Sequence, residues 1–177
     1  LLVKFIFSRE VDERNAVVTM LTGQNQAYSL GALVLGQSLI DIKSELQRII
    51  LVTKDVNHET RSSLRKFWDV REVERISCNP KLGATTSSNK YDLLGNYYHS
   101  KLKYISLTWT KFNAWKLTEF ERILFMDADT LVINPLDDIL YEVSNASLVA
   151  APDILPPDTF NSGVMVITPS VTVYNQL

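Results

Sequence analysis

Apolar runs along the chain alternate between the period of a strand and the period of a helix. Four runs rich in branched apolar residues are typical of strands, at residues 16–22, 48–53, 73–76 and 123–126. Between them, residues 27–42, 57–68 and 107–120 carry apolar positions at helical spacing, with Asn57 as an N-cap. Strands that alternate with helices form βαβ units, so the pattern predicts an α/β fold with a mostly parallel sheet flanked by helices.

The helix at 27–42 is apolar almost all round, which predicts burial over most of its surface. Gly31 and Gly36 lie inside it, and no Lys-Ser/Thr pair follows them, so we interpret them as close packing positions and not as a phosphate loop. Further on, short strands are predicted at 148–152 and 164–167, around a proline-rich loop, and a helix begins near 173. Residues 78–105 form a long irregular stretch, typical of a functional lid or an insert.

Composition narrows the class of protein. The chain has 177 residues, 46% of them hydrophobic, with a net charge of −2 and no basic cluster, so we expect no nucleic-acid partner. The single cysteine, Cys78, fits a reducing compartment and favours a cytoplasmic location. No apolar run approaches the roughly 18 residues of a membrane span. We expect a flanking segment at 1–15, one domain at 16–177, and a piece of a longer protein; a homodimer stays open.

The most informative pattern is Asp127-Ala-Asp129, directly after the apolar run at 123–126. On an extended backbone, Asp127 and Asp129 would share one side and Ala128 would take the other. Ligands of open α/β sheets bind outside the carboxyl ends of the strands, so the two acids would lie at a ligand site. Two carboxylates about 6 Å apart repel by roughly 3 kcal/mol at an effective dielectric near 20. Basic groups could offset this repulsion, and a divalent cation that also binds phosphate would offset it better.

Other patterns compete with or add to this hypothesis. A strand that ends in Asp-x-Asp-x-Thr also begins the phosphatases of the haloacid dehalogenase type, but there the motif follows the first strand, and this chain lacks their later acid pair. His58 and His99 have no partner at metal-ligand spacing and are interpreted as surface or loop residues. Lys111 lies upstream of the acids, among aromatic residues, and is a candidate to reach a diphosphate.

Five ordered segments resemble the glycogenin-like retaining glycosyltransferases of family 8. They are Gly31-Ala-Leu-Val-Leu-Gly-Gln-Ser-Leu39, Thr110-Lys-Phe-Asn-Ala-Trp115, Phe125-Met-Asp-Ala-Asp-Thr-Leu-Val132, Ala150-Ala-Pro-Asp153 and Phe160-Asn-Ser-Gly-Val164. The resemblance runs from about residue 16 to residue 177. It implies a GT-A fold, a Rossmann-like sheet that binds a nucleotide-diphosphate sugar through Mn²⁺, with Mg²⁺ as an alternative.

The resemblance also implies roles for individual residues. Asp127 and Asp129 would bind the metal, with Asp127 also near the ribose and Ala128 along the nucleotide. Lys111 would contact the donor and matter for activity. The uracil and ribose would lie at the loop after the first strand, whose matching residues are Met20, Thr22, Asn25 and Tyr28. This loop is one residue longer here than is usual in the family. The donor sugar would lie near Asp153, Asn161 and Ser162.

Two departures from the family pattern bear on function. The family has a basic residue before the Thr-Lys helix. In this chain only Lys101 or Lys103 could take that place. The family's later metal-binding histidine and diphosphate-binding lysine would lie beyond Leu177, so we expect the isolated chain to bind donor weakly and to turn over little. The leading hypothesis is retaining transfer of a hexosyl group, glucose from UDP-glucose, to a carbohydrate or protein acceptor. The alternative is an inactive domain that binds a nucleotide sugar or a partner, and a Golgi location is the alternative to the cytoplasm if an anchor precedes the chain.

Overall fold

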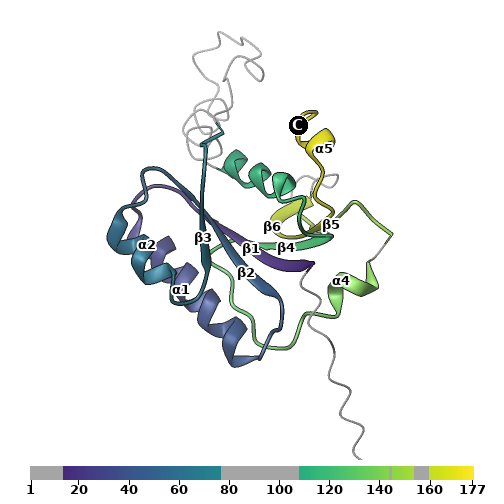
Figure 1. Ribbon diagram of the computed structural model, residues 1–177. Helices are drawn as coiled ribbons and strands as arrows, with labels where there is room; N and C mark the ends of the chain where they lie inside the picture. The colour runs from purple at the N-terminus through teal and green to yellow at the C-terminus, as the bar shows by residue number, and fades with distance from the viewer. Residues whose placement is uncertain (1–13, 77–107, 144, 154–159) are drawn as a thin grey trace, which may run out of the picture.

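The computed structural model describes residues 14–76, 108–143, 145–153 and 160–177 (Figure 1). The flanking segment expected at 1–15 therefore lies almost wholly outside the described residues. The irregular stretch predicted at 78–105 also lies outside them, and with it Cys78, His99, Lys101 and Lys103.

The described strands form one mixed sheet of six, in the order β3-β2-β1-β4-β6-β5. The pairs β3·β2, β2·β1 and β1·β4 are parallel, whereas β6 runs antiparallel to both β4 and β5. The carboxyl ends of four parallel strands therefore meet at one edge of the sheet. The strand bounds are β1 (Asn15–Leu21), β2 (Gln47–Thr53), β3 (Asp69–Val73), β4 (Arg122–Met126), β5 (Leu148–Pro152) and β6 (Phe160–Ile167).

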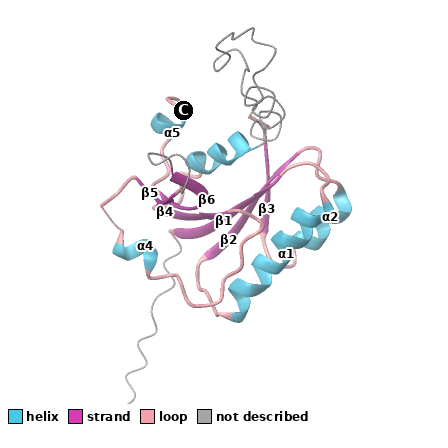
Figure 2. Cartoon of the chain, turned by 180° about the vertical axis from the view of Figure 1, so that it is seen from behind, coloured by secondary structure: helices cyan, strands magenta, loops and turns pink. Residues whose placement is uncertain are grey.

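Helices cover both faces of this sheet. One face carries α1 and α2, and the other carries the 3-10 helix η2 with α5 beside it, as the views from the front and from behind agree (Figures 1 and 2). The helix bounds are α1 (Gln26–Asp41), α2 (His58–Leu64), η2 (Trp109–Lys116), α4 (Ile139–Glu142) and α5 (Val171–Tyr174). The alternation of strands and helices in the first half of the chain confirms the predicted α/β architecture.

Side-chain alternation along the strands divides the interior into two cores. Val17 and Leu21 face α1, whereas Ala16 and Val18 lie in the cluster around η2. Burial on both faces is what makes the central strands continuous apolar runs and not alternating ones. For this reason the predicted bounds of β1, β2 and β4 agree with the observed bounds to within one residue at each end.

Helix α1 differs from the prediction made for it. Leu35 and Leu39 are fully buried, but Leu30 is 62% exposed and Val34 45% exposed, so burial over most of its surface was wrong. A helix in an outer layer has only one covered face, whatever the composition of the other. The interpretation of Gly31 and Gly36 as packing positions is confirmed: a Cβ at Gly36 would lie 2.6 Å from Trp68 Nε1.

Five other elements differ from their predicted bounds, and the helix predicted at 57–68 is the first of them. The predicted helix at 57–68 ends at Leu64 because a tight turn brings Trp68 inward, where its indole N–H donates to the Ala32 carbonyl. Its N-cap is confirmed, since Asn57 accepts from the Thr60 N–H. The strand predicted at 73–76 lies at residues 69–73. It is an edge strand, where charged residues are tolerated, and these charges interrupt the apolar pattern from which strands were predicted.

The helix predicted at 107–120 is a 3-10 helix at residues 109–116. The side-chain amide of Asn113 donates to the Thr110 carbonyl at 2.9 Å, and such local bonds compete with regular helical pairing. The strand predicted at 164–167 begins earlier, at Phe160, and the last helix begins at Val171.

Candidate functional site

The acidic motif occupies a turn and not the end of a strand. Strand β4 stops at Met126, and the Asp127 carbonyl accepts from the Thr130 N–H at 3.1 Å and from its hydroxyl at 2.7 Å. The extended backbone assumed from the sequence was therefore wrong. Within this turn Asp127 is half-buried, Ala128 is 4% exposed and Asp129 is exposed. Both carboxylates lie at the carboxyl edge of the sheet, where a ligand of such a fold binds.

Helix α1 packs directly against this turn. A Cβ at Gly31 would overlap the carbonyl oxygen of Ala128 and approach the Asp129 backbone at 3.6 Å. Ala128 belongs to the core cluster on the α1 side of the sheet. The glycine thus allows the backbones of helix and turn to pack directly against each other. This contact fixes the position of the turn that carries the two acids.

Lys111 of η2 reaches the same turn from the other face. Its side chain is 5% exposed, and its ammonium lies 2.9 Å from Asp127 Oδ1. It also lies 3.0 Å from Ser162 Oγ and 3.1 Å from the Ser162 carbonyl, with the Phe125 ring centroid at 5.3 Å. An ammonium has three N–H donors, and three protein oxygens match them.

This arrangement changes the electrostatic argument made from the sequence. In the structure the charge of Asp127 is neutralised directly by a buried lysine, so a metal is not required to make the acid tolerable. A buried ammonium is itself costly unless it is paired and hydrogen-bonded, and Lys111 meets both conditions. The residues 111, 127 and 162 come from three elements, and the structure brings all three together.

The beginning of β6 closes the site on the side of Asp127. The Asp127 N–H donates to the Gly163 carbonyl at 2.7 Å, and the Gly163 N–H donates to Asn161 Oδ1 at 2.8 Å. A Cβ at Gly163 would lie 3.3 Å from Asp127 Oδ2 and 2.9 Å from Asn161 Oδ1. Asn161 and Ser162, both predicted site residues, therefore flank the carboxylate.

The other predicted residues lie around this centre at the same edge or at neighbouring strand ends. Thr22 and Asn25 follow β1, and Asn25 caps α1 by accepting from the Ala27 N–H at 2.9 Å. Tyr28 is 49% exposed in the first turn of α1, and Met20 packs partly against the η2-side core. Asp153 follows directly after β5 and is partly buried.

Sequence reasoning missed a second polar group at this edge. Asp55 follows β2, accepts a short hydrogen bond from the Thr53 hydroxyl, and pairs with Arg75 at 2.6 Å. The Thr53 hydroxyl, with help from the Arg75 charge and the Gly23 N–H, holds the pKa of the Asp55 carboxyl below its ordinary value despite some desolvation. An acid just after an apolar strand was a usable signal, but Arg75 was assigned to a strand.

The acids fit a hard divalent cation in one specific mode. Mg²⁺-type ions bind through one or two carboxylates plus phosphate oxygens and water, and Asp127 and Asp129 offer such oxygens. Among the described residues no three His, Cys, Asp or Glu side chains group together as a full protein cage. Two carboxylates would suit an ion that takes its remaining ligands from phosphate and water.

Residues 19–176 match the family model described as glycosyl transferase family 8, and the chain belongs to that family. It is similar to Glycogenin-1 of Mus musculus, with 37% identity over 163 residues, or 92% of this chain and 44% of that protein. It is also similar to UDP-glucuronate:xylan alpha-glucuronosyltransferase 1 of Arabidopsis thaliana, with 31% identity over 89% of this chain and 20% of that protein. The chain thus spans less than half the length of these relatives.

Solved structures define the fold. The galactosyltransferase LgtC, in complex with donor and acceptor sugar analogues, superposes with a TM-score of 0.53 at 14% identity, over 86% of this chain and 57% of that one. The glycosyltransferase GlyE of Streptococcus pneumoniae TIGR4 gives 0.53 at 18% identity, over 93% and 37%. The predicted GT-A fold is confirmed, and the family match excludes the phosphatase alternative. In the part of the chain that is described, no helix has the length and apolar content to cross a membrane.

Proposed function

We propose that the chain is the donor-binding part of a glycosyltransferase that moves a hexosyl group, glucose from UDP-glucose, with retention at the anomeric carbon. The acceptor would be a carbohydrate or a protein, and the location cytoplasmic. Support comes from the similarity to glycogenins at 37% identity, and from a relative whose name specifies a UDP-linked sugar. Residues 16–177 would form the donor-binding domain.

The observation that carries this proposal is the convergence of Lys111, Asp127 and Ser162 at the carboxyl edge of the sheet. An acid held by a buried cation has a fixed position, and a fixed ligand geometry is what electrostatic catalysis needs. Asp127 and Asp129 would hold Mn²⁺, with Mg²⁺ as the alternative, and that ion would neutralise the leaving diphosphate.

Lys111 contributes to the proposed site in two ways. Its contacts hold Asp127 against the start of β6. Its charge would raise the positive potential for a bound diphosphate. Asn161 and Ser162 would lie near the donor sugar and Asp153 at its pocket, while Met20, Thr22, Asn25 and Tyr28 would face uracil and ribose. Ala128 would contact the nucleotide through its backbone, because its side chain is buried.

The second candidate is a domain that binds a nucleotide sugar without transferring it. The observation in its favour is that the described residues offer two acids and no third metal-ligand side chain beside them. Transfer of labelled glucose from UDP-glucose, measured on the intact protein, separates the two candidates. Binding of UDP-glucose without any transfer to acceptor or to water would favour the binding domain.

Asp129→Asn tests the metal and donor proposal. The exposed Asp129 carries no packing role, so the substitution should leave the melting temperature unchanged while Mn²⁺-dependent UDP binding falls below detection by calorimetry. Asp41→Asn, at an exposed position in the last turn of α1, is the matched control and should bind UDP as the unaltered protein does. Undiminished UDP binding by Asp129→Asn would refute the proposed metal site.

A further inference from the structure

The ammonium of Lys111 lies where a cation bound to Asp127 would have to approach. It is 2.9 Å from Asp127 Oδ1, the distance of a charge-assisted hydrogen bond. The second oxygen, Oδ2, lies beside the backbone of Gly163, where even a β-carbon would come as close as 3.3 Å. One oxygen of this acid is therefore paired with a cation of the protein itself, and the other lies close to β6.

The same ammonium has no donor left for a ligand. Its three N–H groups are matched by Asp127 Oδ1 and by the hydroxyl and carbonyl oxygens of Ser162. The side chain is 5% exposed, and the Phe125 ring centroid lies 5.3 Å from the ammonium. A direct bond from Lys111 to a diphosphate, as the family resemblance implies, would require one of these protein contacts to break.

The charges of the acidic turn explain what such a lysine does to a metal. Two carboxylates, Asp127 and Asp129, and the ammonium of Lys111 leave one net negative charge among the three groups. A divalent ion at Asp127 would be repelled by the ammonium that shares its carboxylate. A nucleoside diphosphate brings further negative charge and further oxygen ligands, which the two acids alone do not supply.

We propose that Lys111 is a resident counterion of Asp127 and makes uptake of the metal depend on the nucleotide. The proposal rests on the proposed function. Without nucleotide, Lys111 neutralises Asp127 and holds it against β6, so that the acid is in place while a metal alone binds weakly. With a nucleoside diphosphate present, the added negative charge outweighs the repulsion from the ammonium.

Lys111→Met tests this role by a gain of binding. Affinity for Mn²⁺ is measured by calorimetry on the intact protein, first without nucleotide and then with UDP. The unaltered protein should bind Mn²⁺ alone at least about tenfold more weakly than with UDP. In Lys111→Met the affinity for Mn²⁺ alone should rise by about tenfold, because one close positive charge is removed. Loss of structure cannot produce tighter binding.

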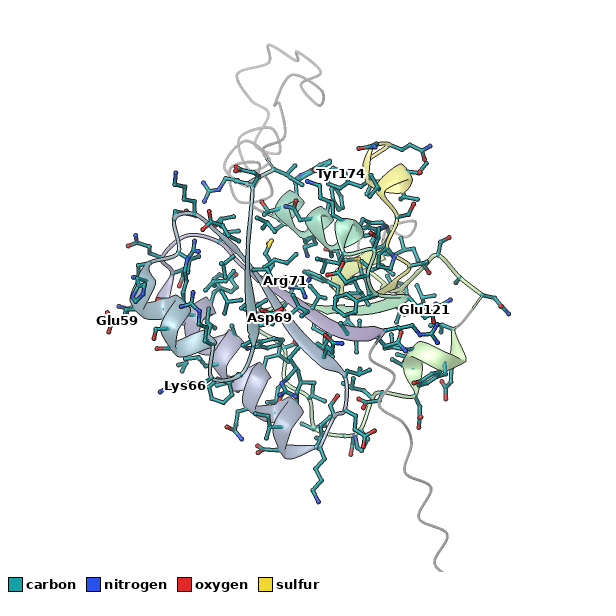
Figure 3. All side chains as sticks on the ribbon, viewed as in Figure 1. Glu59, Lys66, Asp69, Arg71, Glu121 and Tyr174 are labelled. Atoms are coloured by element: carbon teal, nitrogen blue, oxygen red, sulfur yellow. The ribbon has the colours of Figure 1, made fainter. Side chains whose placement is uncertain are left out.

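Two further substitutions separate the charge of Lys111 from its hydrogen bonds. Lys111→Gln removes the charge and keeps N–H donors, so it should bind Mn²⁺ alone as tightly as Lys111→Met does. Lys111→Arg keeps the charge and should bind Mn²⁺ alone as weakly as the unaltered protein. Lys116→Met is the matched control: Lys116 is on the same helix, is exposed, and lies over the ring of Tyr174 on α5 (Figure 3), so its loss should change neither affinity.

The outcomes separate this inference from the proposed function. If Lys111→Met and Lys111→Gln bind Mn²⁺ alone no more tightly than the unaltered protein, the inference is overturned, and Lys111 only holds the turn together. Mn²⁺ binding by the unaltered protein that is equally tight with and without UDP would also overturn it. If the unaltered protein binds neither Mn²⁺ nor UDP when both are present, the proposed function and this inference fall together.

Discussion

At the residue scale, Lys111 illustrates how one buried cation can organise a site made of distant segments. Its three N–H donors meet Asp127 of the turn after β4 and two oxygens of Ser162 in β6. Each partner alone would be a weak, movable contact near the surface. The ammonium is almost completely buried, and removing it leaves the partly exposed Asp127 carboxylate and the Ser162 hydroxyl without that partner.

Lys111→Met should therefore lower the free energy of unfolding by about 2 kcal/mol, since hydrogen bonds to charged groups contribute about 1.5–3 kcal/mol. The loss stays at the low end because Asp127 is 38% exposed and water can reach its carboxylate. Urea denaturation monitored by tryptophan fluorescence measures the difference.

Lys116→Met is the control on the same helix. Lys116 is exposed, and its ammonium lies 4.2 Å from the Tyr174 ring centroid, a contact that contributes about 0.5–1 kcal/mol at an exposed site. Equal losses for the two variants would show that burial and pairing at Lys111 are not what stabilises the turn.

At the element scale, helix α1 and the acidic turn are fitted to each other by the absence of a side chain at Gly31. Gly31→Ala would place a methyl group against the Ala128 backbone, which cannot move aside as a flexible side chain could. Overpacking of this kind lowers the free energy of unfolding by about 1–3 kcal/mol, and the higher helix propensity of alanine offsets at most about 1 kcal/mol of that loss.

The expected result for Gly31→Ala is a net loss of about 1–2 kcal/mol in urea denaturation, together with weaker UDP binding because the acids are displaced. Leu30→Ala, at a neighbouring position that is 62% exposed, should stay within about 0.5 kcal/mol of the unaltered protein. A Gly31→Ala protein as stable as the Leu30→Ala protein would contradict the proposed fit of helix and turn.

The sequence predicted elements well where a run is buried on both faces and poorly where it is not. Strands β1, β2 and β4 are continuous apolar runs, so their positions followed directly. Edge strand β3 was shifted because Asp69 and Arg71 point to solvent and salt-bridge partners, and such charges break an apolar pattern. The 3-10 geometry of η2 depends on what Asn113 bonds in three dimensions, which no local pattern reveals.

The same reasoning explains which residues of the candidate site could be predicted from the sequence. Asp127, Asp129 and Lys111 were identifiable from a motif and a family resemblance, and the structure brings Lys111 and Asp127 together. Arg75 was not identifiable, because its position depends on bonds from its two neighbours to η2. Ile76 bonds Thr110, 34 residues further on, and Glu74 bonds Asn113, 39 residues further on.

At the scale of the whole molecule, the parallel half of the sheet places the carboxyl ends of four strands at one edge, and the described loops after β1, β2 and β4 lie there. Such an arrangement supports a ligand on backbone that is already fixed, so little ordering is required when the ligand binds. Binding should then appear as added stability of the entire domain, because the loops share one sheet and one pair of cores.

Thermal denaturation of the intact protein with UDP-glucose and Mn²⁺ measures this linkage. Ligand at about 100 times its dissociation constant adds about 2.7 kcal/mol, which for a domain of this size raises the melting temperature by about 5 °C or more. Removing the metal with EDTA should abolish the shift, since the diphosphate would then face Asp127 and Asp129 without a bridging ion. UDP-glucuronate and UDP-galactose, tested in the same series, rank the donor sugars. A shift that survives EDTA unchanged would show that the nucleotide binds this edge without a metal and would remove the acids from the proposed metal site.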